Sequence, residues 1–172
     1  TIDPDALVIN ENELGAVIGS LVTTDEDVDD IHTYTISGED EDLFEVVDGI
    51  LKLKDSVSVD YEQIPSLNIT LTTTDSSNQS FSKDIVINVQ DQNDSPTGLL
   101  LSSLRLENDV DGFIIGDLST IDQDINDTHT YTLSGDDADK FEVVNGQLKL
   151  KNGVAADYDT QSSYSVTITS TD

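Results

Sequence analysis

Acidic residues at short, regular spacings are the main chemical signal in this chain. Asp60-Tyr61-Glu62 and Asp122-Gln123-Asp124 each place two carboxylates two positions apart. Because alternate residues of an extended chain point to the same side, both carboxylates of such a pair can converge on one ion. Carboxylates and carbonyls are the oxygen ligands that a hard cation such as Ca²⁺ prefers. The spacing therefore predicts calcium binding.

A third acidic stretch, Asp91-Gln92-Asn93-Asp94-Ser95-Pro96, has the composition of a linker. Polar residues ended by a proline do not continue a strand, because proline lacks the N–H donor and pushes its predecessor toward extended or turn geometry. Side-chain oxygens, and backbone carbonyls that no strand ladder uses, are then free to bind a cation. We expect a calcium joint here, with the candidate ligands Asp91, Gln92, Asn93, Asp94 and Ser95.

Charge is the extreme property of the composition: 36 acidic residues face 7 basic ones over 172 residues, giving a formal net charge of −29. This charge disfavours nucleic acid as a partner, because its phosphates would be repelled, and it favours cations. There is no cysteine, so no disulfide stabilises the fold, and a bound metal is a common substitute in small extracellular sandwiches. No apolar run approaches the ~18 residues that a membrane-spanning helix needs.

Short runs rich in β-branched and aromatic residues predict strands, and no helix of normal length is evident. Asp48-Gly49 has the composition of a hairpin turn. In the first half of the chain the expected strands are Leu7–Ile9 and Ala16–Val22 (a first strand with an interruption), His32–Ile36, Phe44–Val47, Ile50–Lys54, Leu67–Thr74 and Phe81–Val89.

The second half of the chain repeats the first. A shift of 97 positions aligns Asp25–Asp75 with Asp122–Asp172 without a gap, and roughly 28 of the 51 aligned pairs are identical. The identical stretches include His32-Thr33-Tyr34-Thr35 with His129-Thr130-Tyr131-Thr132. The chain is therefore predicted to hold two similar domains, residues 1–95 and residues 96–172.

About seven strands for each domain predict an all-β fold, two tandem Greek-key antiparallel β-sandwiches of the immunoglobulin-like architecture. An odd number of crossings leaves the two ends of each domain at opposite poles, so that tandem copies extend end to end. The second domain stops before a counterpart of Ser76–Val89 and is expected to lack its last strand, which the parent protein would supply beyond residue 172. A sandwich without that strand leaves an edge and an apolar strip uncovered.

The acidic stretches together resemble the cadherin repeats, and more closely the bacterial cadherin-like repeats of large surface adhesins. Asp91–Pro96 is similar to the family's D-x-N-D-N-x-P linker, with Ser95 in place of the second linker asparagine. The other matching stretches are the Glu11 segment, Asp60-Tyr61-Glu62 for D-R-E, Asp122-Gln123-Asp124 for D-x-D, and Thr171-Asp172 for A-x-D. The motifs are specific as a set and weak singly.

The resemblance implies a division of labour among the ligands of two or three calcium ions. The ions nearer the first repeat would be held by Glu11, Asp60, Glu62 and Asp94, and the ion nearer the second by Asn93, Asp122, Asp124 and Asp172. Backbone carbonyls would come from Gln92 and Ser95, with Asn126 as a further candidate.

Two further half-sites are expected at the ends of the sequence. Asp25, Asp27 and Asp75 would face an upstream linker that includes Asp3. The counterpart set for a following linker is Glu107, Asp157 and Asp159, in which Asp159 replaces the family's glutamate by a shorter side chain.

The function expected from these features is that of a calcium-dependent rigid extender, or cell-adhesion segment, of a larger repeat-containing surface protein. Its location would be extracellular, at a cell surface or secreted, and its partners would be neighbouring repeats of the same chain. The alternative is a recognition module in which one repeat itself binds a glycan or protein. An enzyme is not expected, because paired carboxylates at loop ends lack the pocket and the divergent pKa values that glycoside hydrolysis requires.

Other conspicuous residues are assigned structural or surface roles. His32 and His129 occupy equivalent strand positions beside no clustered ligands in the sequence. The acids of Glu39–Asp42, and Asp136, Asp137 and Asp139, are expected to form solvated surface loops.

Overall fold

The computed structural model describes residues 7–27 and 30–172, and it confirms an all-β fold. The chain forms two compact units, Thr1–Gln92 (unit 1) and Asn93–Asp172 (unit 2). Their boundary falls inside the expected linker, earlier than the expected division after residue 95. Asp3, the acid assigned to an upstream linker, lies outside the described residues.

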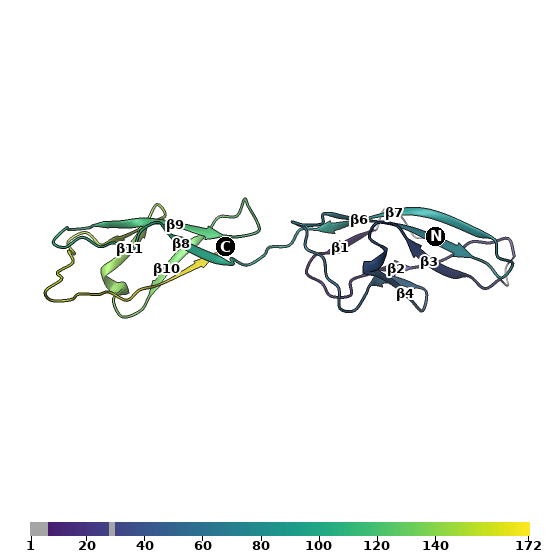
Figure 1. The fold of residues 1–172 in the computed structure, drawn as a ribbon, viewed down its shortest axis with the longest axis horizontal. Helices are drawn as coiled ribbons and strands as arrows, with labels where there is room; N and C mark the ends of the chain where they lie inside the picture. Colours follow the sequence, from purple (N-terminus) through teal and green to yellow (C-terminus); the bar gives the residue numbers. More distant parts are fainter. Residues whose placement is uncertain (1–6, 28–29) are drawn as a thin grey trace. The chain divides into compact units, whose positions relative to one another are not determined.

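Unit 1 consists of two sheets, with strand order β1-β7-β6-β3 in one and β2-β5-β4 in the other (Figure 1). A 3₁₀ turn, η2 (Glu41–Leu43), precedes β4. Asp48 and Gly49 have φ values of 52° and 76°, as a type I′ turn requires, which confirms the hairpin between β4 and β5. The strands are β1 (Val8–Asn10), β2 (Val17–Ser20), β3 (Thr33–Ser37), β4 (Phe44–Val47), β5 (Ile50–Leu53), β6 (Ser66–Thr74) and β7 (Ser80–Gln90).

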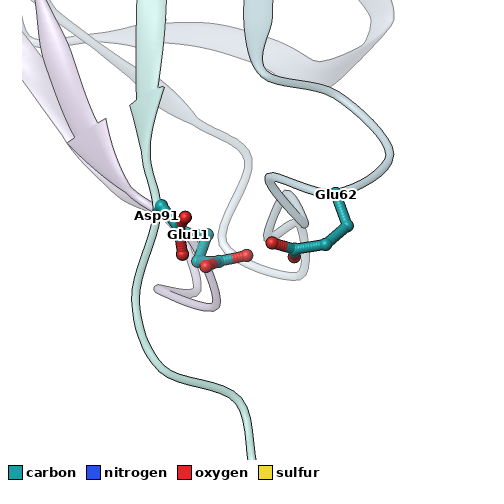
Figure 2. Close-up of side chains that lie close together, drawn as sticks. All are labelled: Glu11, Glu62 and Asp91. Atoms are coloured by element: carbon teal, nitrogen blue, oxygen red, sulfur yellow. The ribbon is translucent and has the colours of Figure 1, made fainter. Parts of the chain in front are cut away.

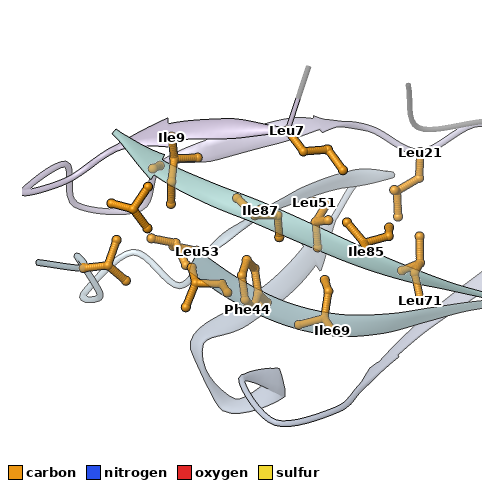
Figure 3. Packing of buried hydrophobic residues seen from close by; sticks show 14 residues of the cluster. Leu7, Ile9, Leu21, Phe44, Leu51, Leu53, Ile69, Leu71, Ile85 and Ile87 are labelled. Atoms are coloured by element: carbon orange, nitrogen blue, oxygen red, sulfur yellow. The ribbon is translucent and has the colours of Figure 1, made fainter. Parts of the chain in front are cut away.

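The core of unit 1 follows from the alternation of apolar and polar residues along β6 and β7. Successive side chains of a strand point to opposite faces, so one set of alternate residues faces the second sheet. Leu67 and Ile87 are cross-strand partners with no exposed surface, and Leu51 and Leu53 of β5 are equally enclosed. Figure 3 shows the packing of this cluster, which also includes Leu7, Ile9, Phe44, Ile69, Leu71 and Ile85.

The sheets of unit 1 differ from the expected antiparallel pattern at one edge. β1 runs parallel to β7, with Asn10 opposite Gln90, whereas the other strand pairs in the described part of unit 1 are antiparallel. A chain that crosses a sandwich an odd number of times starts and ends in the same direction, so a first and a last strand that are neighbours must be parallel. This pairing brings Glu11 and Asp91, which follow β1 and β7, to the same end of unit 1.

Unit 2 repeats most of this arrangement, with strand orders β11-β12-β9-β8 and β10-β13. Leu150 has no exposed surface, and the rings of Phe141 and Tyr164 pack edge to face with centroids 5.8 Å apart. A 3₁₀ turn, η3 (Ala138–Lys140), precedes β11 as η2 precedes β4. The strands are β8 (Gly98–Leu101), β9 (Ile114–Ile121), β10 (Thr130–Ser134), β11 (Phe141–Val144), β12 (Gln147–Leu150) and β13 (Thr167–Thr171).

β13 has one paired edge. It pairs with β10, and within residues 93–172 no strand pairs with its other edge. The strand begins at Thr167, three residues after Tyr164. The pairing of β6 in unit 1 explains this start. Thr70–Thr74 pairs with both β3 and β7, whereas Ser66–Ile69 pairs with β7 alone. The residues of unit 2 that correspond to Ser66–Ile69 therefore have no partner strand within residues 93–172. A cavity of about 560 Å³ lies beside this edge, lined in part by Leu104, Leu106, Phe141, Tyr164, Val166 and Ile168.

One aspartate that the sequence suggested to be a solvated surface residue is a buried brace of unit 2. Asp137 accepts hydrogen bonds from the backbone N–H of Ser165 at 2.8 Å, from Gln161 Nε2 at 2.8 Å and from Lys140 Nζ at 2.7 Å. The bonds from Gln161 and Lys140, followed by that from Ser165, lower the pKa of Asp137 to about 2. Asp40 makes the equivalent bond in unit 1 to the N–H of Asn68, at 2.7 Å. The surface assignment was wrong for Asp137, which is buried, whereas Asp40 is half-buried.

Appending a copy of Ser76–Gln90 directly after Asp172 should stabilise unit 2. The added strand can pair with the free edge of β13 and fill the cavity with the alternate apolar side chains that β7 buries in unit 1. We expect a higher melting temperature and slower amide exchange at residues 164–166. A matched extension carrying Ile85→Asp and Ile87→Asp should give neither effect. Equal behaviour of the two extended chains would contradict this assignment of the edge.

Replacing Asp137 by Asn should destabilise unit 2 in a pH-dependent way. A carboxyl whose folded-state pKa is depressed stabilises the fold above its ordinary pKa, near 3.8, and this contribution is lost as the pH falls toward about 2. The melting temperatures of wild type and variant should therefore differ at pH 7 and converge between pH 4 and pH 2. Asp136→Asn, at an exposed neighbour, is the control. A difference that persists unchanged at pH 2 would assign the loss to packing alone.

Candidate metal centres

The carboxylate of Glu11 joins three segments of unit 1. Glu11 comes directly after β1, and the residue is only 3% exposed. Glu11 Oε2 accepts a hydrogen bond from the backbone N–H of Tyr61 at 2.7 Å, and Oε1 accepts one from the N–H of Gln92 at 2.7 Å. Hydrogen bonds to an ionised acceptor are about twice as strong as neutral ones. Glu11 therefore fixes both the loop after β5 and the chain that leaves β7.

Three carboxylates from these segments converge. Ligand oxygens of Glu11, Glu62 and Asp91 all lie within 4.8 Å of one another. In Figure 2, Glu11 and Asp91 lie together beside the ends of their strands, and Glu62 points toward them from the loop. Negative charges at this separation repel, and a divalent cation among them would offset the repulsion.

Asp60 supplies an independent test of whether these residues fit a cation. Its Oδ2 accepts a hydrogen bond from Gln63 Nε2 at 2.6 Å. Its Oδ1 is enclosed and has no hydrogen-bond partner. Among the buried side-chain oxygens and nitrogens of the described residues, this atom alone is unsatisfied. A buried acceptor without a partner is costly, and coordination to a metal would satisfy it. We name Glu11, Asp60, Glu62 and Asp91 the Glu11 set.

Unit 2 assembles its own set around the other half of the linker. The N–H of Asp94 donates to Asp124 Oδ2 at 2.7 Å, and Gln123 Nε2 donates to Asp94 Oδ2 at 2.8 Å. Asn93 Nδ2 donates to Asp172 Oδ2 at 2.6 Å. Asn93 and Asp94 are thus held against Asp172 and the D-x-D motif of this unit. We name Asn93, Asp94, Asp122, Asp124 and Asp172 the Asp122 set.

The histidines lie beside the acidic motifs, contrary to the sequence-based expectation. His129 Nε2 is 2.8 Å from Asp122 Oδ2, and His32 Nε2 is 3.1 Å from Asp25 Oδ2. The bond from His129 is the largest cause that lowers the pKa of Asp122, while the backbone N–H of Asp27, and then His32, lower that of Asp25. The available signal was the identical spacing of aspartate and histidine in the two repeats.

The upstream set of unit 1 differs by one residue from the expected one. Ligand oxygens of Asp25, Asp30 and Asp75 lie within 4.8 Å of one another, a cluster that includes Asp30 and does not include Asp27. Asp27 instead donates its backbone N–H to Asp25 Oδ1 at 3.1 Å and accepts from the N–H of Asp30 at 3.1 Å. Asp30 is identical to its aligned residue, Asp127, which was the signal that the sequence reading missed.

The downstream set, Glu107, Asp157 and Asp159, stays a prediction, and its contacts differ from those of the Glu11 set. Asn108 Oδ1, not a Glu107 oxygen, accepts the N–H of Tyr158 at 2.7 Å, which mirrors the bond from Tyr61 to Glu11. Glu107 forms an ion pair with Arg105 at 2.7 Å. Asp157 accepts from the Thr160 hydroxyl and from the N–H groups of Thr160 and Asp159, bonds that lower its pKa with the hydroxyl first. The acid that organises unit 1 is therefore a neutral amide in unit 2.

Ser95 and Asn126 are exposed, and their role as carbonyl ligands stays a prediction. The carbonyl of Gln92 has the same standing, although its N–H and side chain are placed, the latter donating to the Asp91 carbonyl at 2.6 Å. Among the described residues no helix is long and apolar enough to cross a membrane.

Comparisons with known proteins found similar sequences and similar folds. No protein-family model matches the chain. Over 178 residues the sequence is 32% identical to human Protocadherin Fat 1, a match that covers 96% of this chain and 4% of that protein. The solved structure of human Protocadherin-24 EC1-2, form II, is similar with a TM-score of 0.67 and 22% identity, covering 86% of this chain and 77% of that chain. The fold is that of cadherin repeats.

A second solved structure extends the likeness over nearly the whole chain. Mouse Cadherin-23 EC22-24 is similar with a TM-score of 0.64 and 22% identity, covering 99% of this chain and 57% of that chain. The sequence match to Protocadherin Fat 1 and the shared fold both show that this chain is similar to cadherin repeats. The chain spans 4% of the length of that curated relative.

Neutralising Glu62 should separate the effect of a cation from that of the fold. In a chelator, Glu62→Gln should melt at or above the wild-type temperature, because it relieves repulsion with Glu11 and Asp91. In millimolar calcium the wild type should gain stability, about 2.7 kcal/mol at a hundredfold excess over Kd, and the variant should gain less. Glu13→Gln, at an exposed position, is the control. Wild-type melting curves that are identical in chelator and calcium would exclude the cation.

Proposed function

We propose that the chain is a calcium-dependent, non-enzymatic extender segment of a larger extracellular adhesion protein. The observation that carries this proposal is the Glu11 set, in which three carboxylates converge and the loop that carries Glu62 also holds the enclosed and unpartnered Oδ1 of Asp60. These residues supply the hard oxygen ligands that calcium takes at roughly 2.3–2.6 Å. Repulsion between like charges works against folding, so folding alone does not explain why these carboxylates converge.

The action proposed for the site is mechanical. Gln92 is held in unit 1 by its N–H to Glu11, and Asp94 is held in unit 2 by its N–H to Asp124. The backbone bonds of the linker that can still rotate are therefore the few that lie between Gln92 and Asp94. Calcium supplies charge neutralisation and additional bonds to these acids when it binds, and the chain's own contacts hold the acids in position. The result would be a segment that projects a distant binding domain from a surface.

The proposed setting follows from the relatives and the charge. Protocadherin Fat 1 and the similar solved structures carry cadherin or protocadherin names, and the proposed partners of this chain are neighbouring repeats of its own polypeptide. A location at the cell surface or in a secreted protein would provide millimolar calcium for sites of moderate affinity. A closer relation to bacterial surface adhesins stays a prediction.

The recognition module remains the second candidate, and one observation favours it. Phe81 of β7 is 68% exposed and lines a cavity of about 270 Å³ in unit 1, together with Val22, Tyr34 and Lys83. Exposed aromatic side chains can stack on sugars or anchor a protein partner. A glycan array probed with wild type and Phe81→Ser would discriminate, because an extender needs no glycan contact at Phe81.

Small-angle scattering provides the test of the mechanical role. In calcium the wild type should show a larger and narrower distribution of dimensions than in chelator, because bound ions restrict the linker. Asp124→Ala should lose this calcium response, while circular dichroism and the cores of both units remain native, because Asp124 lies in a loop. Asp136→Ala is the control. A wild-type profile that does not respond to calcium, despite measured calcium binding, would refute the extender function.

A further inference from the structure

The two histidines of the chain stand in the same relation to an acidic motif. In each repeat the histidine lies seven positions after the first aspartate of D-x-D, as His32 after Asp25 and His129 after Asp122. In both units Nε2 lies within hydrogen-bond distance of Oδ2 of that aspartate, at 3.1 Å and 2.8 Å. A carboxylate only accepts, so the imidazole donates its Nε2–H. The same contact is therefore present in both units.

The contact in unit 2 joins the ends of two sheets. Asp122 follows β9 directly, and His129 precedes β10 directly. β9 and β10 belong to different sheets, and the loop 123–128 runs between them. Each partner is therefore attached to a rigid strand end, which leaves little freedom for the carboxylate once the bond is made.

The bond to His129 completes the orientation of Asp122. The Asp122 side chain is only 4% exposed, and its Oδ1 accepts the N–H of Asp124 at 3.2 Å. Asp124 in turn holds the N–H of Asp94 at 2.7 Å. One hydrogen-bonded series thus runs from His129 through the D-x-D motif to the linker. The imidazole fixes the orientation of the carboxylate by donating its Nε2–H to Oδ2.

We propose that His129 is a positioning residue that holds the Asp122 carboxylate ready to bind calcium, and that His32 does the same for Asp25. The inference rests on the proposed calcium-binding function. Groups behind metal ligands typically change metal affinity by about 10- to 100-fold when they are removed, because they fix the orientation of the ligand before the metal arrives. The shorter bond and the more enclosed aspartate of unit 2 predict a larger effect there than in unit 1, where the Asp25 side chain is 29% exposed.

The experiment measures calcium binding and metal-free stability separately on the full 172-residue chain. Isothermal titration, with a competing chelator, should show one class of sites weakened about 10-fold or more in His129→Phe, while the class formed by the Glu11 set keeps its affinity. His129→Gln retains an N–H donor and should recover most of the loss. His32→Phe is the matched variant and should have the smaller effect.

Metal-free melting in chelator and a double-mutant cycle decide between positioning and simple structural support. If His129 positions Asp122, the metal-free melting temperature changes little in His129→Gln, and His129→Phe adds little loss of affinity once Asp122 is already Asn. Unchanged calcium affinity in His129→Phe overturns the inference. Affinity and metal-free stability that fall in parallel, without recovery in His129→Gln, also overturn it. A wild type that binds no calcium overturns both this inference and the proposed function, whereas normal binding in every histidine variant overturns this inference alone.

Discussion

A buried carboxylate that accepts two backbone N–H groups is the interaction on which the end of unit 1 depends. Glu11 takes one donor from the loop after β5 and one from the chain that leaves β7. Without it, two buried or half-buried donors would lose their acceptor, and the segments that carry Glu62 and Asp91 would lose their common support. The candidate metal centre is thus built on a contact that the fold needs in any case. The parallel pairing of β1 and β7 makes this contact available, because it places both strand ends together.

The comparison of the two units shows how a repeated framework can carry different chemistry. Asn108 keeps the bond that Glu11 makes, since its amide oxygen accepts the N–H of Tyr158. It cannot provide the negative charge or the second acceptor oxygen. The loop geometry is therefore preserved while one ligand is weakened. Asp157 differs from Asp60 in the same direction, because its oxygens are already occupied by Thr160 and Asp159.

Strand positions and the acidic motifs could be predicted from the sequence because both are local signals. Alternation of apolar residues placed β6 and β7, and the Asp48-Gly49 turn placed the hairpin between β4 and β5. Contacts between distant segments could not be predicted in this way. The burial of Asp137 depends on Gln161, Lys140 and Ser165 meeting in three dimensions, and no spacing in the sequence reports that. The contacts of the two histidines and the substitution of Asn108 for an acid escaped for the same reason. The shift of 97 positions pairs His32 with His129 and, when it is continued toward the N-terminus, pairs Glu11 with Asn108.

The unpaired edge of β13 affects the tendency of this chain to aggregate. An open edge in residues 93–172 presents unused N–H and C=O groups, which are a template for intermolecular β-pairing. Two copies that approach through this edge also repel each other, because each chain has a formal net charge of −29. The repulsion keeps the copies apart at low ionic strength. At physiological salt the range of this repulsion falls to a Debye length of about 8 Å. Colloidal stability of this chain is therefore an electrostatic property, and a cation that reduces its charge also removes part of the barrier to aggregation.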